Sequence, residues 1–558
     1  MDKRLLYAAS AAAASIVVSV IIVRTYIYSF QPTPRITPVS LTPLSRISAS
    51  LLASRDAMAQ RLAAALRFRT ISYEDSEGNA ASLLEDIDAI PKKSCGGCVC
   101  CKNDDASSSS SSEKKDACTS PTPEALSESR CAFLALHRHL ETSFPNLHAT
   151  LERHIINKYS LIYIWRPSNI EFSTRAAVAL AAHLDVVPVP DAAEWLHAPF
   201  DGVISNDGFI HGRGAIDDKH SLLTICEAVE ALIIAGVKPT RPIILTFGHD
   251  EELGGMDGAA AIAQNLPLLL KDCKADRPLS FLLDEGLFLL RELFPGVSRR
   301  VALVCTREKG HVNVELKVTA PAGHSSVPPS SSSIGTLAKA ICAIEVESTR
   351  APLFNEPAFS LLRALAPDLP LPIRVLVANS WLFAPLLRSA LLASSKTAAL
   401  LRSTTAVTMT SGGLKSNVLP PFATALINHR VHPNESVADV VARDQAAVGP
   451  LISCRPFEEL EPAPVAQSDG AIGWESVRDA LTVVYPDATI AQGLMLGNTD
   501  TRHFWKLADN IYRHCPVSLT VNETAMFHGK NEKISIDQLP LLASFYAAVL
   551  LGSACGGL

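Results

Sequence analysis

The chain has 558 residues, of which 48% are hydrophobic and 19% are charged, and its net charge at pH 7 is −6. This length allows more than one domain, each with its own hydrophobic core. The slightly acidic balance contains no basic stripe, so we expect no nucleic-acid partner.

The first thirty residues differ in character from the rest of the chain. Lys3 and Arg4 precede an uncharged apolar run over residues 5–23, which is about the length that a helix needs to cross a bilayer. No small-residue cleavage signal follows, which favours an uncleaved signal anchor over a removed signal peptide or a buried core helix. The anchor predicts a single-pass membrane protein, and the excess of Lys3 and Arg4 over Arg24 predicts that its N-terminus lies in the cytoplasm. Its main part would then lie in a lumen, such as that of a vacuole or lysosome, or outside the cell.

The next part of the chain contains a linker, a helix and an unusual insertion. Residues 31–50 are rich in Pro, Ser and Thr, and residues 51–68 show a helical pattern. Residues 91–123 contain a CxxCxCC cluster and a serine run, which are typical of a disordered insertion. Zinc binding is a weaker alternative because the cluster lacks a second pair of ligands, and loop disulfides or lipidation are no better supported.

Strand-like and helical patterns then alternate. Helices are predicted at residues 124–142, 218–234 and 259–270, and strands at residues 159–165, 176–182, 242–247 and 279–283. This alternation predicts an α/β layer with a mainly parallel sheet. Because ligands gather beyond the carboxyl ends of such strands, polar residues that follow them are candidate site residues.

The pattern changes near residue 310, where apolar and polar residues begin to alternate with period two. Strands of this half-exposed, antiparallel type are predicted at residues 311–319, 406–412 and 423–431, with helices at 334–347 and 437–448. They predict a small α+β domain inserted into the first domain, which resumes near residue 471. The apolar, helix-leaning part over residues 361–401 would either shape an acyl pocket or pack as core or lid.

Two adjacent carboxylates, Glu251 and Glu252, follow the predicted strand 242–247 in the run GHDEELGG. Neighbouring side chains at a strand end point in different directions, so one can bind a metal while the other holds a water. On its own, an acidic pair in a Gly-rich loop is usually just solvated.

Other acidic and histidine residues follow predicted strands, open a predicted helix or lie late in the chain. His183 can bind a metal through one ring nitrogen, and Asp185, on the same side of an extended chain, can fix its tautomer. Asp217 can bridge two metals, although it or Asp218 could simply cap the following helix. Asp284 and His528 are further candidate ligands, and each alone would more often be structural.

In this order the motifs resemble those of the M20 family of dinuclear zinc amidohydrolases and peptidases. The chain is most similar to the branch of carboxypeptidase S and the N-fatty-acyl-amino-acid synthase/hydrolases. The motifs that carry the resemblance are AAHLDVVPVP, EWLHAPFDG, GFIHGRGAIDDK, GHDEELGG, LLDEG and PAGHSSVPP. The resemblance extends from about residue 51 to the C-terminus, apart from the Cys/Ser-rich insertion.

The resemblance implies a domain organisation. Residues 1–30 would be the transmembrane anchor and 31–50 a linker. The catalytic domain would comprise residues 51–306 and 469–558, and residues 307–468 would form a lid of the dimerisation type. A homodimer through that lid is a possible assembly.

The resemblance also implies two Zn2+ ions, for which Co2+ or Mn2+ could substitute. One ion would be bound by His183 and Asp284 and the other by Glu252 and His528, with Asp217 bridging them. The peptide bond between Asp217 and Asp218 would be cis.

Further roles follow from the resemblance. Glu251 would be the general base, and Asp185 would orient His183. His324, in the lid domain, would support the oxyanion within its own subunit or across a dimer. The substrate would be contacted by Arg430, Asn417, Gly497 and Thr499, with the arginine suited to a carboxylate.

These inferences predict a zinc-dependent hydrolase that cleaves an amide bond next to a free carboxylate, as a carboxypeptidase on short peptides. The alternative is an N-acyl (fatty-acyl) amino acid hydrolase/synthase. A rival of another class is a non-catalytic binding ectodomain on a hydrolase fold.

Overall fold

The computed structural model describes residues 3–30, 41–73, 123–294, 296–347 and 356–555. The Cys/Ser-rich insertion predicted at residues 91–123 therefore lies outside the described residues, except for its last residue. Side chains of the first helix, α1 (Lys3–Ile27), are described from residue 15 onward.

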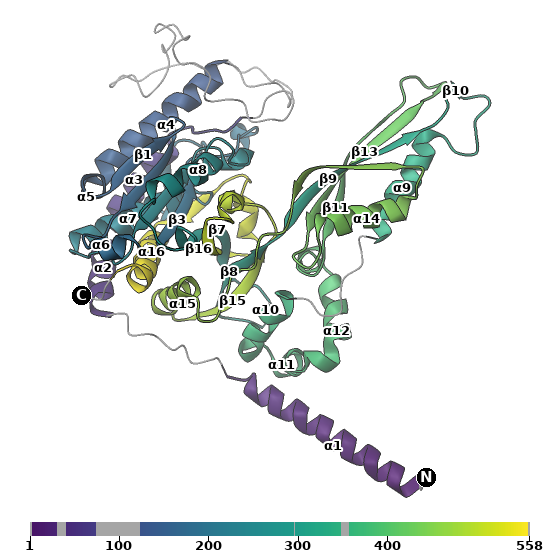
Figure 1. The fold of residues 1–558 in the computed structure, drawn as a ribbon, viewed down its shortest axis with the longest axis horizontal. Coiled ribbons are helices and arrows are strands. Elements are labelled where there is room, and N and C mark those ends of the chain that lie inside the picture. Colours follow the sequence, from purple (N-terminus) through teal and green to yellow (C-terminus); the bar gives the residue numbers. More distant parts are fainter. Residues whose placement is uncertain (1–2, 31–40, 74–122, 295, 348–355, 556–558) are drawn as a thin grey trace.

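An eight-stranded sheet forms the centre of the larger part of the molecule, in the order β1-β2-β6-β3-β7-β16-β8-β15 (Figure 1). The pairs β6–β3, β3–β7, β7–β16 and β8–β15 are parallel, whereas β1–β2, β2–β6 and β7–β8 are antiparallel. The strands are β1 (Glu152–Ile156), β2 (Ser160–Trp165), β3 (Ala177–His183), β6 (Ile243–Gly248), β7 (Leu279–Arg291), β8 (Arg300–Glu308), β15 (Ala488–Met495) and β16 (Ala508–Thr520).

The sheet is thus mixed, and four of its seven neighbouring pairs are parallel, in keeping with the prediction of a mainly parallel sheet. The connection between β1 and β2 is a tight turn in which Asn157 and Lys158 both have positive φ, at 47° and 70°. Such a short hairpin can join only antiparallel neighbours. β1 had no prediction, because it begins with Glu152, Arg153 and His154, which leave little apolar signal.

Helices cover both faces of this sheet. One face is packed by α7 (Lys219–Ile234), α15 (Ile472–Val484) and α16 (Leu539–Ser553), and the other by α8 (Ala259–Leu269). Side chains of β7 alternate between the two cores, since Phe281 lies in the first core and Leu282 in the second. The first core also includes side chains of α2 (Leu41–Ala53), α3 (Arg55–Leu66), α4 (Pro123–Ser143) and α5 (Pro145–Thr150).

Within the described residues, one stretch is long and apolar enough by itself to cross a membrane, namely residues 536–553. It contains α16 and is 72% buried inside the protein, where it packs against α7 and α15. This burial is what a core helix requires, since a membrane span would expose its apolar side chains to lipid.

A smaller antiparallel sheet projects from the larger one, in the order β11-β13-β9-β14 (Figure 1). Its strands are β9 (Gly310–Thr319), β11 (Thr404–Gly412), β13 (Phe422–Val431) and β14 (Ser453–Leu460), and it packs against α9 (Ser333–Glu347) and α14 (Val437–Val448). The predicted alternation is confirmed in β9, where every second side chain is buried. α14 begins at a capping box formed by Ser436 and Asp439.

The two sheets are joined by a direct crossing of the chain. Only Lys309 separates β8 of the large sheet from β9 of the small one. The returning segment after β14 runs beside it, and a side chain at Gly310 would place its Cβ 2.4 Å from the carbonyl oxygen of Leu460. The two segments pass so closely that only glycine fits at residue 310.

The helix-leaning stretch between the small sheet's strands is confirmed as a set of helices. These are α10 (Ala358–Leu365), α11 (Leu371–Ala378), α12 (Ser380–Leu392) and α13 (Ser395–Ala398). α10 packs on β15, and α11 contacts α1. The remaining elements are short: α6 (Ile170–Ser173), a three-stranded sheet of β4 (Val203–Ile204), β5 (Phe209–His211) and β17 (Lys533–Ser535), and the pair β10 (Gly323–His324) with β12 (Val418–Leu419).

Candidate active site

Several predicted site residues meet at one edge of the large sheet, beyond the ends of β3 and β6. His183 is the last residue of β3 and pairs with Gly248, the last residue of β6. Glu251 and Glu252 follow β6 in a short 3-10 helix (Glu251–Leu253), and Asp217 lies just before α7. This is the edge at which the sequence predicted a ligand.

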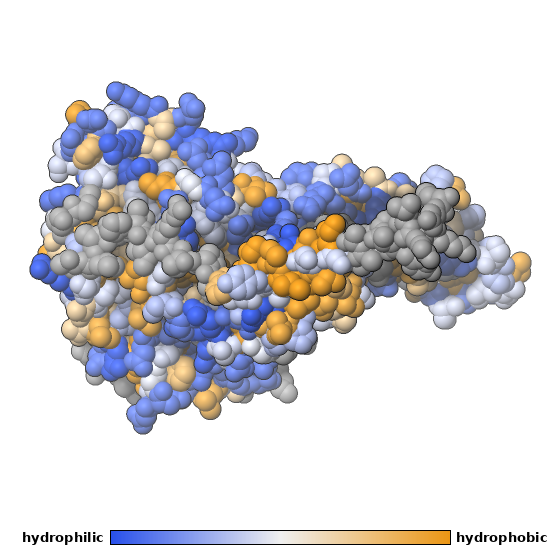
Figure 2. Space-filling model, turned by 90° about the horizontal axis from the view of Figure 1, so that it is seen from below, coloured by the Kyte–Doolittle hydropathy of each residue, from blue (hydrophilic) through white to orange (hydrophobic). Residues whose placement is uncertain are grey.

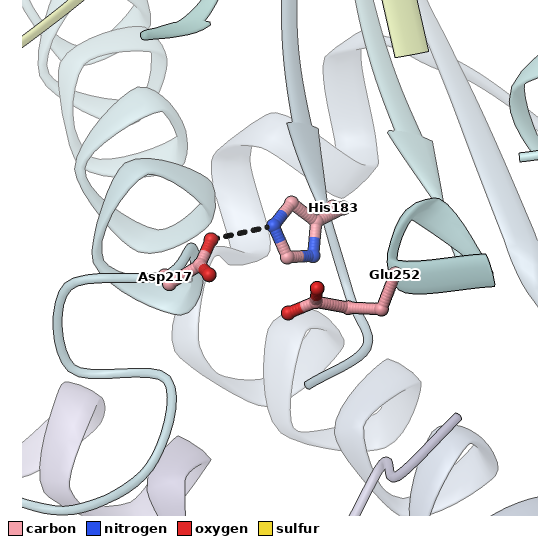
Figure 3. A group of neighbouring side chains, drawn as sticks. All are labelled: His183, Asp217 and Glu252. Carbon is pink, nitrogen blue, oxygen red and sulfur yellow. Dashed lines mark hydrogen bonds and ion pairs between the residues drawn. The ribbon is translucent and has the colours of Figure 1, made fainter. Parts of the chain in front are cut away.

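A first group of possible metal ligands consists of His183, Asp217 and Glu252, whose ligand atoms lie within 4.8 Å of one another (Figure 3). His183 Nε2 is 3.0 Å from Asp217 Oδ1. The other carboxylate oxygen, Asp217 Oδ2, lies 2.8 Å from His528 Nε2, which is in turn 3.1 Å from Glu252 Oε2. The Asp217 carboxylate therefore lies between two histidines, as a bridging ligand would.

A second group consists of His183, Glu251 and Glu285. Asp284 is in neither group; with His183 and Glu251 it lines a small cavity beside α8. The apolar run at residues 279–283 predicted a strand that ends at Asp284, but β7 continues to Arg291. Adjacent residues of a strand point to opposite faces, so Asp284 and Glu285 have different surroundings. Glu285 is a candidate ligand that had no predicted role, although the motif LLDEG contains it.

Asp185 holds the histidine and the acidic turn together. Its Oδ1 lies 3.3 Å from His183 Nδ1 and accepts a hydrogen bond from the backbone N–H of Glu251, while Oδ2 accepts from that of Glu252 (both 3.1 Å). Ser72 Oγ also donates to Oδ2, at 2.6 Å. Burial tends to raise the pKa of Asp185, but the hydrogen bonds from His183 and Ser72 bring that pKa below its ordinary value.

The loop that carries Asp217 is held by a residue without a predicted role, Glu532. This fully buried carboxylate accepts hydrogen bonds from Arg213 Nη1 (2.7 Å) and from the backbone N–H groups of Gly214 (3.1 Å), Ile216 (2.6 Å) and Asp217 (3.1 Å). The peptide bond after Asp217 is cis, as the resemblance implied. The only sign of this role in the sequence is that Glu532 lies four residues after the candidate ligand His528. The loop that Glu532 binds lies more than 300 residues earlier in the chain, so the sequence does not show their contact.

The electrostatics of this edge suit a bound cation. Burial, together with repulsion from Asp217, raises the pKa of Glu252 to about 7, and burial raises that of Asp284 to about 6. Burial also raises the pKa values of Glu251 and Glu285 well above the ordinary value. Within the described residues, the buried Glu252 Oε1 has no hydrogen-bond partner. Histidine and carboxylate donors with such an orphaned oxygen fit a divalent metal such as zinc.

Two predicted residues of the smaller domain lie elsewhere. His324 and Asn417 are exposed, and the backbone N–H of Ser325 donates to the carbonyl oxygen of Asn417 at 3.1 Å. Figure 1 places β10, which contains His324, at the end of the smaller domain that is remote from the large sheet. Within one chain, the structure does not bring these two residues to the acidic groups.

The other predicted substrate contacts lie where the two sheets join. Arg430 Nη1 donates to Asn498 Oδ1 at 2.7 Å, in the turn that also contains Gly497. The neighbouring Thr499 is buried, and its backbone N–H donates to Glu308 Oε1 at 3.0 Å. Because its hydroxyl is also paired with another threonine, Thr499 is occupied by the protein's own network.

The sequence profile of peptidase family M20/M25/M40 matches residues 179–552 of this chain. The chain belongs to this family. It is 38% identical over 422 residues to "Probable carboxypeptidase S-like 2" of Dictyostelium discoideum, covering 74% of this chain and 78% of that protein. It is also 38% identical over 375 residues to "N-fatty-acyl-amino acid synthase/hydrolase PM20D1" of Xenopus tropicalis, covering 67% and 72%.

A solved structure shares the fold of this M20 protein. The M20 family metallo-carboxypeptidase Sso-CP2 from Sulfolobus solfataricus matches with a TM-score of 0.53 at 19% identity, covering 76% of this chain and 93% of that one. The predicted family, its branch and the assignment as an M20-type enzyme are therefore confirmed.

Proposed function

We propose that this M20 enzyme is a zinc-dependent hydrolase that cleaves an amide bond next to a free carboxylate, acting as a carboxypeptidase on short peptides. The observation that carries the proposal is the position of the Asp217 carboxylate between His183 and His528. Glu251 lies beside this arrangement, in a group that shares His183. A bridging acid with a free carboxylate next to it is what a two-metal hydrolase requires.

The proposed ligands are taken from the two groups and from His528, which lies 2.8 Å from Asp217 and 3.1 Å from Glu252. Asp217 would bridge, Glu252 and His528 would hold one ion, and His183 with Glu285 would hold the other, in place of the Asp284 assigned from the sequence. Zinc suits this set of ligands, and Co2+ or Mn2+ could replace it. Bound there, the cations would polarise the amide carbonyl and lower the pKa of water.

The protein's own residues would then carry the proton. Glu251 would take it from the attacking water and return it to the leaving amine. Asp185 would keep His183 in one tautomer and hold the Glu251–Glu252 turn through the two backbone hydrogen bonds that it accepts.

We assign recognition of the substrate carboxylate to Arg430, because a guanidinium pairs with a carboxylate through two hydrogen bonds. Asn498 holds it beside Gly497, at the junction of the sheets. His324 and Asn417 would act only after movement of the smaller, lid-like domain, or on the site of a second subunit in a homodimer.

N-acyl amino acids are the second candidate substrates. The observation that favours them is the likeness to the PM20D1 relative, which is as high as that to the carboxypeptidase S-like protein. Both substrate classes place a carboxylate next to the scissile amide. A non-catalytic binding ectodomain is disfavoured because the sequence lacks neither the predicted base nor any of the predicted metal ligands.

The proposal extends to location. We assign α1 to a membrane anchor, with the two sheets in a lumen or outside the cell. Support comes from its apolar side chains, which are exposed on most of the described part of the helix.

The test is turnover of a dipeptide panel and an N-acyl amino acid panel by the full-length protein and by Glu251→Gln, with and without a chelator. We expect the variant to keep its metal content, measured by mass spectrometry, and to lose about 10²–10⁴-fold in kcat. Glu171→Gln, at an exposed position of α6, is the matched control and should leave turnover unchanged.

The class of substrate that is cleaved distinguishes the two candidate activities. Chelator-sensitive release from dipeptides supports the carboxypeptidase, and release only from N-acyl amino acids supports the second candidate. Unchanged turnover in Glu251→Gln would refute the assigned base. A metal-loaded wild-type protein that cleaves neither panel would favour the binding ectodomain.

A further inference from the structure

Two apolar elements that are about 350 residues apart in the sequence lie together on one side of the molecule. The C-terminal part of α1 contacts the corner between α11 and α12 (Figure 1). The hydrogen bonds that join them are Arg24 Nε to the Ala378 oxygen (2.9 Å), Asn379 Nδ2 to Thr25 Oγ1 (3.2 Å) and Arg374 Nη1 to Ser29 Oγ (3.2 Å). Polar groups thus fix the end of α1 to this helical corner.

The α1 helix itself has apolar side chains that the protein does not cover. Ile16, Val18, Ile22 and Val23 are all exposed, with Ile22 at 63%. These positions do not form one narrow stripe, and a helix that is apolar on several sides needs an apolar environment. With 25 residues, α1 is about 38 Å long, which is sufficient for a hydrocarbon core of about 30 Å.

The α11–α12 pair has an uncovered apolar face of its own. Leu371 and Ile373 of α11 and Trp381, Leu382 and Leu386 of α12 are exposed, with Leu386 at 56%. Leu382 and Leu386 are one helical turn apart and so lie on the same side of α12. The opposite side is buried against the protein through Ala384 and Leu387.

The geometry of this pair excludes a simple crossing of a bilayer. Taken together, α11 and α12 are long and apolar enough for a membrane segment, but they are bent by 115° at their junction. A bent, one-sided apolar pair is suited to lie in the interface between headgroups and acyl chains. Seen from the side of α1, the surface shows a hydrophobic patch near the middle of the molecule (Figure 2).

We propose that α11 and α12 form a second membrane contact, which docks on the surface of the bilayer that α1 crosses. The inference rests on the proposed anchor, because α1 brings the bilayer to this side of the protein. The end of α1 that is fixed to the corner is the end at which the helix leaves the hydrocarbon. The exposed side chains of α11 and α12 are then level with the interface, where Trp381 is a preferred residue type.

A lipid surface fits this face better than a second protein copy. The exposed apolar side chains of the pair adjoin those of α1, so one apolar environment covers both. The pair is held against the large sheet through α10, which contacts α11 and packs on β15. Docking would therefore hold the whole enzyme in one orientation on the membrane, and amphiphilic substrates would reach it from the bilayer surface.

The tryptophans of this chain provide a direct test. The chain has five, of which Trp165, Trp195 and Trp474 are buried and Trp505 is half-buried, whereas Trp381 is 44% exposed. Full-length protein would be placed in nanodiscs of phosphatidylcholine with or without bromine on the acyl chains, which quenches nearby tryptophan. We expect brominated lipid to remove about one fifth of the emission, because one of five tryptophans would contact it.

The variants decide whether the quenched residue is on α12. Trp381→Phe keeps the apolar character and should abolish the quenching, while the matched control Trp505→Phe should preserve it. A Leu382→Glu/Leu386→Glu variant should also lose most of the quenching. Wild-type emission that is insensitive to brominated lipid, or quenching that persists in Trp381→Phe, would overturn the proposal.

Two further measurements separate lipid docking from the membrane-anchor proposal and from association with a second copy of the chain. Alkaline extraction tests the anchor: if α1 is not an anchor, the protein leaves the membrane altogether. Retention without quenching would refute the second contact alone. A doubled mass, with Trp381 protected from aqueous acrylamide but not quenched by brominated lipid, would assign the face to a second copy and refute lipid docking.

Discussion

Removing Glu308 should destabilise the enzyme at the crossing between its two sheets. Glu308 is the last residue of β8 and is fully buried. Its carboxylate lies 2.6 Å from Arg513 Nε and accepts hydrogen bonds from the Thr499 N–H (3.0 Å), Thr501 Oγ1 (3.0 Å) and Asn498 Nδ2 (3.2 Å). Glu308→Ala would remove all of these interactions at once.

The cost follows from what the substitution leaves behind. Arg513 is also fully buried, and within the described residues its Nη1 and Nη2 have no hydrogen-bond partner. Its charge would lose the carboxylate that compensates it, and breaking one side of a buried pair costs about 3–5 kcal/mol. In Glu308→Ala/Arg513→Met the uncompensated charge is absent, so this double variant should be more stable than Glu308→Ala.

The assay is denaturant-induced unfolding of the full-length protein in one detergent, with the free energy of unfolding compared among variants. Asp487→Asn is the matched control, because it removes a pair with Arg300 that is partly exposed and should cost about 1 kcal/mol or less. If Glu308→Ala cost no more than this control, or if the double variant were less stable than Glu308→Ala, the reasoning about the buried pair would be refuted.

The remaining predictions concern the metal groups and a buried histidine. Glu285→Ala should lose about half of the bound metal, measured by mass spectrometry, while Asp284→Ala keeps it; the reverse result would return the ligand to Asp284. Burial lowers the pKa of His137 to about 4, and its Nε2 bonds the Tyr159 carbonyl oxygen at 2.8 Å. In the unfolded chain His137 takes up a proton below about pH 6.5, whereas in the folded protein it does so only below about pH 4. The free energy of unfolding should therefore decrease as the pH is lowered from about 6.5 to about 4, with a loss of about 2 kcal/mol by pH 5. His137→Gln should lose that part of the slope in unfolding experiments at pH 7 and pH 5, and an unchanged slope would contradict the assignment.

Much of the acidic edge could be predicted from sequence because several of its residues follow an apolar strand or open a helix. His183 and Glu251 are of this kind, and the parallel pairing of β3 with β6 brings the two strand ends together. Strand pairing alone therefore turns motifs that are distant in sequence into one site. The assignment of Asp284 depended instead on where β7 ends, and an apolar run followed by acids does not show whether the strand continues through them.

The residues of the smaller domain were harder for a different reason. His324 is in a recognisable motif, but its position relative to Glu251 depends on the orientation of one domain against the other, and no local pattern encodes that orientation. In this structure the two parts are joined by the crossing at Lys309 and by the hydrogen bond from Arg430 of the smaller sheet to Asn498. Arg430 and Asn498 are 68 positions apart, so this contact becomes visible only after folding.

The same crossing connects domain orientation to substrate recognition. Asn498 donates to Glu308 Oε1 and to the Lys309 carbonyl oxygen, and it accepts from Arg430 of the smaller sheet. The residue proposed to bind the substrate carboxylate is thus held by a network centred on the point where the chain changes sheets. Any rotation of the smaller domain must stretch or exchange these bonds, so movement of His324 toward a substrate would also move Arg430. Closure and carboxylate recognition are therefore expected to be one event in this enzyme.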